Sequence, residues 1–357
     1  MRKKAVIGMS GGVDSSVAAC LLKEQGYDVI GVTMQIWQQE DALQASENGG
    51  CCGLSAVEDA RRVAGMLGIP HYVMNFRDEF QKKVIDYFTA EYLCGRTPNP
   101  CIACNRYVKW EALLGRALAI GADYIATGHY GQIERLANGR YTLRMTASVK
   151  DQTYALYSLT QEQLSRTLMP LAGHTKEEVR ELARRYHLPV AAKPDSQEIC
   201  FIPDQNYAGF IEREAKEVLP PPGSFVTKDG RKLGAHKGII HYTIGQRKGL
   251  NLAMGHPVFV TRICADTNEV IIGEAEDVMT RELHCHHLHY MAVERFEDGD
   301  RFLAKIRYGH KGAYCQVEHV GDDCLHCTFE QPVRAVTPGQ AVVFYRDGCV
   351  AGGATIL

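Results

Sequence analysis

Ala5-Val-Ile-Gly-Met-Ser-Gly-Gly-Val-Asp-Ser-Ser16 begins as an apolar run and turns, through two glycines, into an amphipathic one. We expect Ala5–Ser10 to be a buried strand and Ser15–Gln25 a helix. Glycines at such a turn let the backbone approach an anion, so the helix N-terminus and its amides face phosphate groups. The segment has neither the lysine of a Walker loop nor the G-x-G-x-x-G spacing of a dinucleotide fold. A tight turn with a serine cap is the structural alternative.

The same alternation of strand-like and helix-like segments continues outward from this turn. Because parallel strands joined by helices give this pattern, it indicates an α/β domain with a parallel sheet that binds ligands at the carboxyl ends of its strands. The expected strands are 28–34, 71–75 and 124–127, and the expected helices are 55–67, 80–94, 106–120 and 176–186.

The pattern changes after a proline-rich linker at 219–223, which follows a short predicted helix at 207–214. Short alternating runs separated by turn residues then predict β structure in small barrels. These runs are 257–264, 269–273, 302–307, 315–320, 324–329 and 341–345. The sequence thus predicts three domains: a nucleotide-binding domain (1–203), a small, mostly β central domain (204–275) and a C-terminal β-barrel (276–357).

Composition narrows the classes of protein. The chain has 357 residues, a net charge of −2 and no apolar run long enough for a signal peptide or a membrane span, so we expect a cytoplasmic protein. Thirteen cysteines, an odd number, argue against a structural disulfide framework, and we expect most of them to be buried as small hydrophobes. One basic cluster, at 228–248, is either a solvated surface or an anion-binding face. Its basic residues are Lys228, Arg231, Lys232, Lys237, Arg247 and Lys248.

Two cysteines lie in settings that favour reactivity. Cys104 follows a proline-bearing segment, and we expect a helix to begin near Asn105, so that its dipole lowers the thiol pKa from an ordinary value of about 8.5. Cys200 lies in a polar connector. A thiolate in either place would be a nucleophile, a sulfur carrier or a metal ligand.

The turn at 8–16 resembles that of the PP-loop ATP pyrophosphatases, which adenylate a carbonyl oxygen and release pyrophosphate. The resemblance implies that Asp14 helps to place Mg²⁺ and that Met34 lines the adenine pocket. The residues that it implies for ATP are Gly8, Met9, Ser10, Gly11, Gly12, Val13, Asp14, Ser15, Met34 and Gly128.

Along nearly its whole length the chain resembles the tRNA-specific 2-thiouridylases. The matching segments are 8–15, 95–100 with Cys104-Asn105, 126–130, 150–154, 193–201, 242–249 and 352–356. The resemblance implies a transferase that adenylates the C2 oxygen of the wobble uridine of a tRNA and replaces it with sulfur. Sulfur would arrive as a persulfide on Cys200, and Cys104 would either attack C2 or reduce the persulfide through a Cys104–Cys200 disulfide.

The same resemblance implies partners and RNA contacts. A persulfide carrier protein or a cysteine desulfurase would supply sulfur, and a monomer would suffice. The base would be flipped from the anticodon stem-loop, since C2 is inaccessible in a stack. The residues implied to contact tRNA are Asn99, Pro100, Cys101, His129, Lys150, Asp151, Gln152, Arg307, Tyr308 and Gln340.

One departure from the family pattern leaves an alternative open. Many relatives have an acid where this chain has Cys101, so Cys101, Cys104 and Cys200 could instead ligate a [4Fe–4S] cluster. Cys51 and Cys52 are expected in a loop over the nucleotide. A zinc site from 284–287 and 324–327 is disfavoured because the ligand spacing is irregular.

Two rival functions remain: a PP-loop ligase acting on a small molecule, and a non-catalytic RNA-binding protein. The first needs neither the two reactive cysteines nor the β domains. The second does not need the intact loop at 10–16.

Overall fold

The computed structural model describes residues 2–36, 54–146, 148–195, 199–215 and 219–357. These residues form two compact units. The first comprises 1–85, 100–205 and 348–350, and the second comprises 86–99, 206–347 and 351–357. Among the residues described, no helix is long and apolar enough to cross a membrane.

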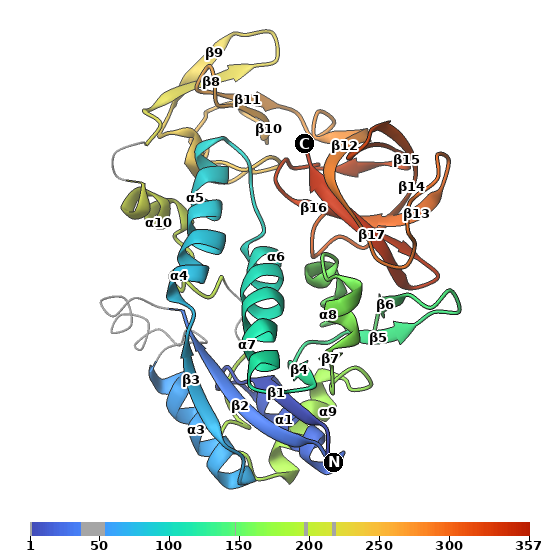
Figure 1. The fold of residues 1–357 in the computed structure, drawn as a ribbon. Coiled ribbons are helices and arrows are strands. Elements are labelled where there is room, and N and C mark those ends of the chain that lie inside the picture. The colour runs from blue at the N-terminus through green and yellow to red at the C-terminus, as the bar shows by residue number, and fades with distance from the viewer. Residues whose placement is uncertain (1, 37–53, 147, 196–198, 216–218) are drawn as a thin grey trace. The chain divides into compact units, whose positions relative to one another are not determined.

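The first unit is built on a parallel sheet, as the sequence predicts (Figure 1). Its strand order is β3-β2-β1-β4-β7, so the chain leaves β1 toward one edge and later returns to β1's other side. The carboxyl end of β1 therefore lies at a topological switch point, where open α/β sheets bind ligands. The strands are β1 (Lys4–Gly8), β2 (Asp28–Gln35), β3 (His71–Asn75), β4 (Tyr124–Ala126) and β7 (Thr167–Leu168).

Three helices pack together against one side of this sheet (Figure 1). They are α1 (Val13–Glu24), α3 (Leu54–Leu67) and α9 (Lys176–Arg185). Their small and β-branched residues, such as Val17, Val63 and Val179, are fully buried against strand residues such as Ile7. Dispersion contacts and apolar burial in this layer hold α1, and with it the turn before α1, in place.

A second helical layer runs from residue 100 to 119. It consists of α6 (Pro100–Ala103), a π-helical stretch (Cys104–Leu113) and α7 (Leu114–Ala119). The indole Nε1 of fully buried Trp110 donates to Thr167 Oγ1 at 2.8 Å, which ties this layer to β7. The remaining elements of the unit are α4 (Arg77–Phe80) with a π turn (Gln81–Ile85), β5 (Gln132–Arg135), β6 (Tyr141–Arg144), a 3₁₀ turn (Thr153–Leu156) and α8 (Gln161–Ser165).

The central part of the second unit is a small sheet in the order β10-β11-β8-β9, in which only β11 and β8 run parallel. Its core includes Phe225, Tyr242 and Val260. The elements are α5 (Asp86–Leu93), α10 (Tyr207–Glu214), β8 (Gly223–Thr227), β9 (Lys232–His236), a 3₁₀ turn (Ile239–His241), β10 (Phe259–Cys264) and β11 (Glu269–Gly273).

The C-terminal part of this unit is a closed antiparallel barrel. β12 pairs with β15 on one side and with β17 on the other, which closes the sheet. Because β12 has a partner on each side, it presents no free strand edge. The strands are β12 (Met279–Tyr290), β13 (Arg301–Lys305), β14 (Ala313–Gly321), β15 (Cys324–Arg334), β16 (Ala341–Arg346) and β17 (Cys349–Ile356).

Three expectations need correction. The helix expected at 80–94 contains a π turn, and its two halves belong to different units. The helix expected from 106 begins at Pro100, because proline at a first helical position needs no amide partner. Of the eleven cysteines in the described part of the chain, only five are buried.

Candidate functional site

The carboxyl ends of β1, β2 and β4 bring the residues expected to bind ATP to one edge of the sheet. At this edge lie the loop after Gly8, the residue Met34 near the end of β2, and Gly128 just after β4. Ile7 and Ala126 are paired across β1 and β4, which fixes the distance between the first and the last of these segments. This edge is the candidate nucleotide site.

The loop at 10–16 is shaped by its own hydrogen bonds. Ser15 Oγ accepts from Ser10 N at 3.2 Å, and Ser16 Oγ donates to Gly12 O at 2.8 Å. Gly11 has φ +66°, and an added Cβ would lie 2.3 Å from Ala56 O, so only glycine fits there. Gly12 is the N-cap of α1 and brings no side chain to its first turn. These contacts therefore preorganise the loop, so that its backbone amides are already in place to face a phosphate.

Gly128 is required because the turn after β4 lies directly on the start of α1. An added Cβ would lie 2.7 Å from Ser15 N and 2.8 Å from Asp14 C. Two residues later, Tyr130 Oη donates to Asp14 Oδ1 at 2.9 Å. Burial, followed by the negative charge of Asp14, raises the pKa of Tyr130, so the phenol stays protonated and keeps donating.

Asp14 also belongs to a chain of charges that sequence analysis missed. Buried Lys176 Nζ lies 2.7 Å from Asp14 Oδ1 and 2.9 Å from Asp195 Oδ1. Arg180 and Lys150 contact the same Asp195 carboxylate at 2.7 and 3.4 Å. Burial by itself would raise the pKa of Asp195, but Lys176 and then the other two cations outweigh it and lower that pKa.

A sequence signal for Lys176 exists, but it is incomplete. Thr175 and Glu178 form a capping box, which identifies Lys176 as the first residue of a helix. Nothing local indicates that this lysine reaches an aspartate 162 residues earlier.

The segment leading to Cys200 is hydrogen-bonded to the nucleotide loop. Lys193 Nζ donates to Gly11 O at 3.1 Å and pairs with Asp59 Oδ2 at 3.0 Å. Gly11 is the left-handed glycine of the loop, so the contact is to the loop's tightest point. This hydrogen bond holds the segment against the loop.

The structure changes the expected setting of Cys104. Because the helix begins at Pro100, exposed Cys101 lies in its first turn and Cys104 is the first residue of the π-helical stretch. Cys104 is half-buried. Cys101, rather than Cys104, therefore lies at the start of the helical stretch.

Cys200 lies in a turn closed by Ile202 N donating to Ile199 O at 2.9 Å. Its neighbour Phe201 is buried and packs edge-on against Phe80 at the end of α4, with ring centroids 5.6 Å apart. Helix α6, which leads into Cys104, packs against the π turn that follows Phe80. Both cysteines thus come from segments that contact one helical stretch, residues 80–85.

Cys101, Cys104 and Cys200 are the alternative cluster ligands expected from the sequence. In the described ranges, no three His, Cys, Asp or Glu side chains converge as a set of metal ligands. A [4Fe–4S] cluster at these cysteines stays a prediction. In the barrel, His284 stacks on His326, and Cys285 and Cys327 are buried in the core. Cys51 and Cys52 lie outside the described residues.

Residues 129 and 150–152 surround the turn after β4. His129 Nδ1 lies 2.9 Å from Thr127 Oγ1, and burial, together with Lys109, lowers its pKa well below the ordinary value, so it is neutral. The Gln152 side chain accepts from Tyr130 N at 3.0 Å. Asp151 accepts from backbone amides on both sides of it, at Thr146 and Thr153. Asp151 and Gln152 thus shape this loop, whereas Lys150 pairs with Asp195.

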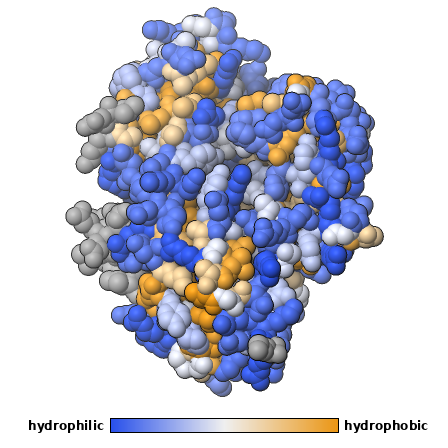
Figure 2. Space-filling view, viewed as in Figure 1, coloured by the Kyte–Doolittle hydropathy of each residue, from blue (hydrophilic) through white to orange (hydrophobic). Residues whose placement is uncertain are grey.

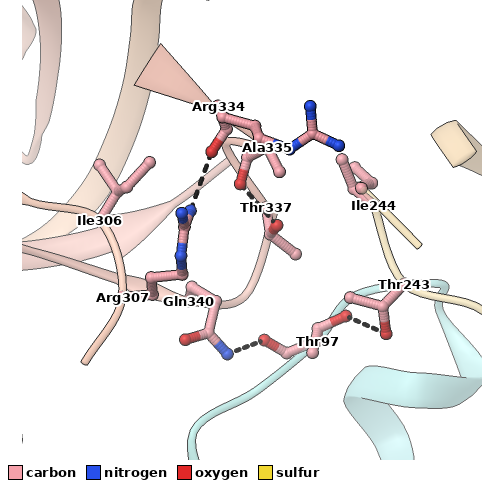
Figure 3. A pocket seen from close by; sticks show the side chains of 10 residues that line it. Thr97, Thr243, Ile244, Ile306, Arg307, Arg334, Ala335, Thr337 and Gln340 are labelled. Atoms are coloured by element: carbon pink, nitrogen blue, oxygen red, sulfur yellow. Dashed lines mark hydrogen bonds between the residues drawn. The ribbon is translucent and has the colours of Figure 1, made fainter. Parts of the chain in front are cut away.

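In the second unit, two of the residues expected to contact tRNA line a cavity of ≈ 390 Å³ (Figure 3). Arg307 donates to Arg334 O at 2.8 Å, and Gln340 Nε2 donates to Thr97 O at 2.8 Å. Tyr308 follows Arg307 in the chain and is exposed. Sequence analysis did not single out Arg334, a second cation at this cavity. The full lining is Thr97, Thr243, Ile244, Gly245, Ile306, Arg307, Arg334, Ala335, Thr337 and Gln340.

The basic cluster at 228–248 is an exposed surface. All six of its lysines and arginines are exposed. They lie on the β8–β9 hairpin and in the segment that follows it, and the surface of this hairpin is mostly hydrophilic (Figure 2). An anion-binding role for this face stays a prediction.

Comparisons with known proteins cover the chain from end to end. Residues 3–204 match the tRNA methyl transferase HUP domain, 209–274 the tRNA methyl transferase PRC-barrel domain and 280–356 the aminomethyltransferase beta-barrel domain.

Curated relatives match over nearly their full length. A protein of Lachnoclostridium phytofermentans named tRNA-specific 2-thiouridylase MnmA is 64% identical over 99% of this chain and 99% of its own. Proteins with the same name are 55% identical in Clostridium perfringens and 54% identical in Carboxydothermus hydrogenoformans, each covering 99% of this chain and 98% of its own. The chain therefore belongs to the tRNA-specific 2-thiouridylase family.

Proposed function

We propose that this chain uses ATP to replace the C2 oxygen of the wobble uridine of tRNA with sulfur. The observation that carries the proposal is the hydrogen bond from Lys193, seven residues before Cys200, to Gly11 of the nucleotide loop. An activating site and a sulfur-carrying cysteine on adjoining segments are what this chemistry requires, because the activated base and the sulfur must meet.

The first step is adenylation. The uridine C2 oxygen attacks the α-phosphorus of ATP, and pyrophosphate leaves with the electrons of the broken P–O bond. The loop amides and the start of α1 would hold the phosphates, and Met34 and Gly128 would contact the nucleoside. Asp14 would hold Mg²⁺ together with phosphate oxygens, an ordinary ligand set for this ion. Mg²⁺ would neutralise charge on the leaving pyrophosphate.

The second step delivers sulfur. Adenylation turns the C2 oxygen into part of a good leaving group, AMP. A persulfide on Cys200 supplies the sulfur, and the half-buried Cys104 has two roles open to it. In one route its thiolate attacks C2 and expels AMP, the outer sulfur of the Cys200 persulfide then displaces it from C2, and the freed thiolate cleaves the S–S bond by attacking Cys200 Sγ. In the other route its thiolate attacks Cys200 Sγ first and releases sulfide, which attacks C2 and expels AMP. Both routes end in a Cys104–Cys200 disulfide and a sulfur atom on C2.

RNA contacts would come from both units. In the first, Pro100, Cys101, His129 and 150–152 surround or precede the two catalytic segments. In the second, Asn99 and the cavity with Arg307 and Gln340 would contact backbone and loop shape, the usual mode for RNA. A cytoplasmic monomer served by a persulfide carrier or a cysteine desulfurase completes the proposal.

The test is mass spectrometry of tRNA nucleosides after reaction with ATP, Mg²⁺ and a persulfide donor. We expect 2-thiouridine with the unaltered protein and none with Cys104→Ser or Cys200→Ser. Cys101→Ser should retain most activity, since no cluster is proposed at that residue. Full activity of the Cys200→Ser protein would refute the persulfide step.

Pyrophosphate release separates the rival functions. Release that requires tRNA supports the proposal. Release with a small acceptor and no RNA would indicate a small-molecule ligase, and no release under any condition would indicate a protein that only binds RNA.

A further inference from the structure

A short segment before Cys200, residues 191–195, is clamped by one arginine of α9. Arg180 Nη1 donates to Ala191 O at 3.4 Å and to Lys193 O at 3.2 Å. Its Nη2 donates to Asp195 Oδ1 at 2.7 Å. A rigid guanidinium fork holding three acceptors fixes both the course of this segment and its side chains.

The same segment is linked to the nucleotide loop at two points. Lys193 Nζ donates directly to Gly11 O at 3.1 Å. Asp195 is linked to Asp14 through buried Lys176, whose Nζ is within 2.9 Å of both carboxylates. All these residues belong to the first unit. Cys200 is five positions after Asp195 in the chain.

We propose that Lys193 and Asp195 are positioning residues that hold the segment leading to Cys200 at the nucleotide loop and so couple adenylation to sulfur transfer. This inference rests on the proposed function. Two ammonium groups, from Lys193 and Lys176, lie against the loop that would receive a polyphosphate, and Asp195 holds one of them. Phosphate charge attracts both cations, so an occupied loop strengthens the hold on the 191–195 segment.

The consequence is chemical fidelity. A uridine adenylate that meets no sulfur reacts with water, which restores uridine and releases AMP, so one ATP is spent without thiolation. Because the segment leading to Cys200 is held at the loop, sulfur transfer outruns this hydrolysis. Loosening the segment should therefore raise the pyrophosphate released per 2-thiouridine formed, while adenylation itself continues.

The experiment uses Lys193→Met and Asp195→Asn in the full chain, with tRNA, Mg²⁺-ATP and a persulfide donor. Pyrophosphate and 2-thiouridine are measured in the same reactions. Glu134→Gln is the control, because it removes another ion pair of the same unit, with Arg144 of β6. Lys193→Arg tests whether restoring the cation restores coupling.

We expect the ratio of pyrophosphate to 2-thiouridine to rise about fivefold or more in both variants. Fivefold is the lower end of the effects that coupling between two sites usually has. The control should leave the ratio unchanged, and Lys193→Arg should bring it back toward that of the unaltered protein. A ratio unchanged in Lys193→Met, with both products reduced together, would overturn the inference.

Two further outcomes are informative. If Asp195→Asn does not fold, the half-exposed Lys193 still carries the test through its methionine and arginine variants. If the unaltered protein forms no 2-thiouridine, the proposed function fails. If it does and only the ratios stay equal, the coupling alone is wrong.

Discussion

Replacing Gly128 with alanine should disturb the nucleotide site directly. The new Cβ would lie 2.7 Å from Ser15 N and 2.8 Å from Asp14 C. Both are backbone atoms of the first turn of α1, and neither can rotate away as a side-chain tip can. Restoring an ordinary contact of 3.4 Å from 2.7 Å requires a displacement of about 0.7 Å between the turn after β4 and the start of α1.

The cost follows from this overlap. Overpacking of this kind costs about 1–3 kcal/mol in the free energy of unfolding. For a unit of this size, a loss of about 2 kcal/mol lowers the Tm by roughly 4–8 °C. A shift approaching 1 Å in groups that position a ligand costs up to about 100-fold in activity, so we expect ATP to bind at least about tenfold more weakly.

The assay is thermal unfolding with and without Mg²⁺-ATP, together with calorimetric titration of ATP. Gly65→Ala is the matched control, because Gly65 is exposed in α3 and no atom lies within 4 Å of its added Cβ. Alanine there should stabilise the protein by about 0.5–1 kcal/mol. A Gly128→Ala protein with an unchanged Tm and unchanged ATP affinity would refute the steric argument.

Three other predictions concern the charges and the loops. Lys176→Met removes the ammonium group between the carboxylates of Asp14 and Asp195. We expect the free energy of unfolding, measured by urea denaturation, to fall by about 2 kcal/mol, less than for a fully buried pair because the Asp14 side chain is 34% exposed. An unaltered denaturation midpoint would contradict this. Since the pKa of Asp195 is lowered in the folded state, its stabilisation is present above its ordinary pKa of about 3.9 and is lost as pH falls through the folded value. The stability difference between the unaltered protein and Asp195→Asn should therefore be largest near neutral pH and shrink below about pH 4, and a difference that grows on acidification would reverse the sign of this argument. Gln340→Ala removes hydrogen bonds to the carbonyls of Thr97 and Pro98 and should destabilise the second unit by about 1 kcal/mol. Urea denaturation followed by fluorescence would detect this loss, and the isosteric Gln340→Glu should show the same loss.

Much of the fold was predictable because its signals are local. The apolar run 5–9 and the glycines after it identify a strand and a turn, and strand β11 has the bounds that its alternation predicts, Glu269–Gly273. The stretch 284–287, which alternates as a strand does, lies in β12, but the bounds of this strand and its buried residues Leu283 and Cys285 were not predicted. The helix start at Pro100 was also missed, because proline was interpreted as a breaker when it is equally suited to a first helical position.

The candidate site, like the fold, was predictable from the sequence only in part. Gly128 and the loop at 10–16 were found because glycine and serine patterns next to strand ends have a local physical meaning. Lys176, Arg180 and Lys193 were not found, because a lysine in a helix start or a connector is ordinary until its partner is known. Sequence analysis also assigned Gln340 only to RNA, whereas the structure shows it holding the backbone at Thr97.

The sequence by itself determined that the chain has a glycine- and serine-rich turn after its first strand, two cysteines in unusual settings and a β-rich C-terminal part. Only the tertiary structure decided which charges meet: Asp14 with Lys176, and Lys193 with Gly11. The reason is physical. Strand, turn and helix preferences act between neighbours in the chain, whereas these contacts join residues 162 and 182 positions apart, and folding of the sheet and its helices brings them within hydrogen-bonding distance.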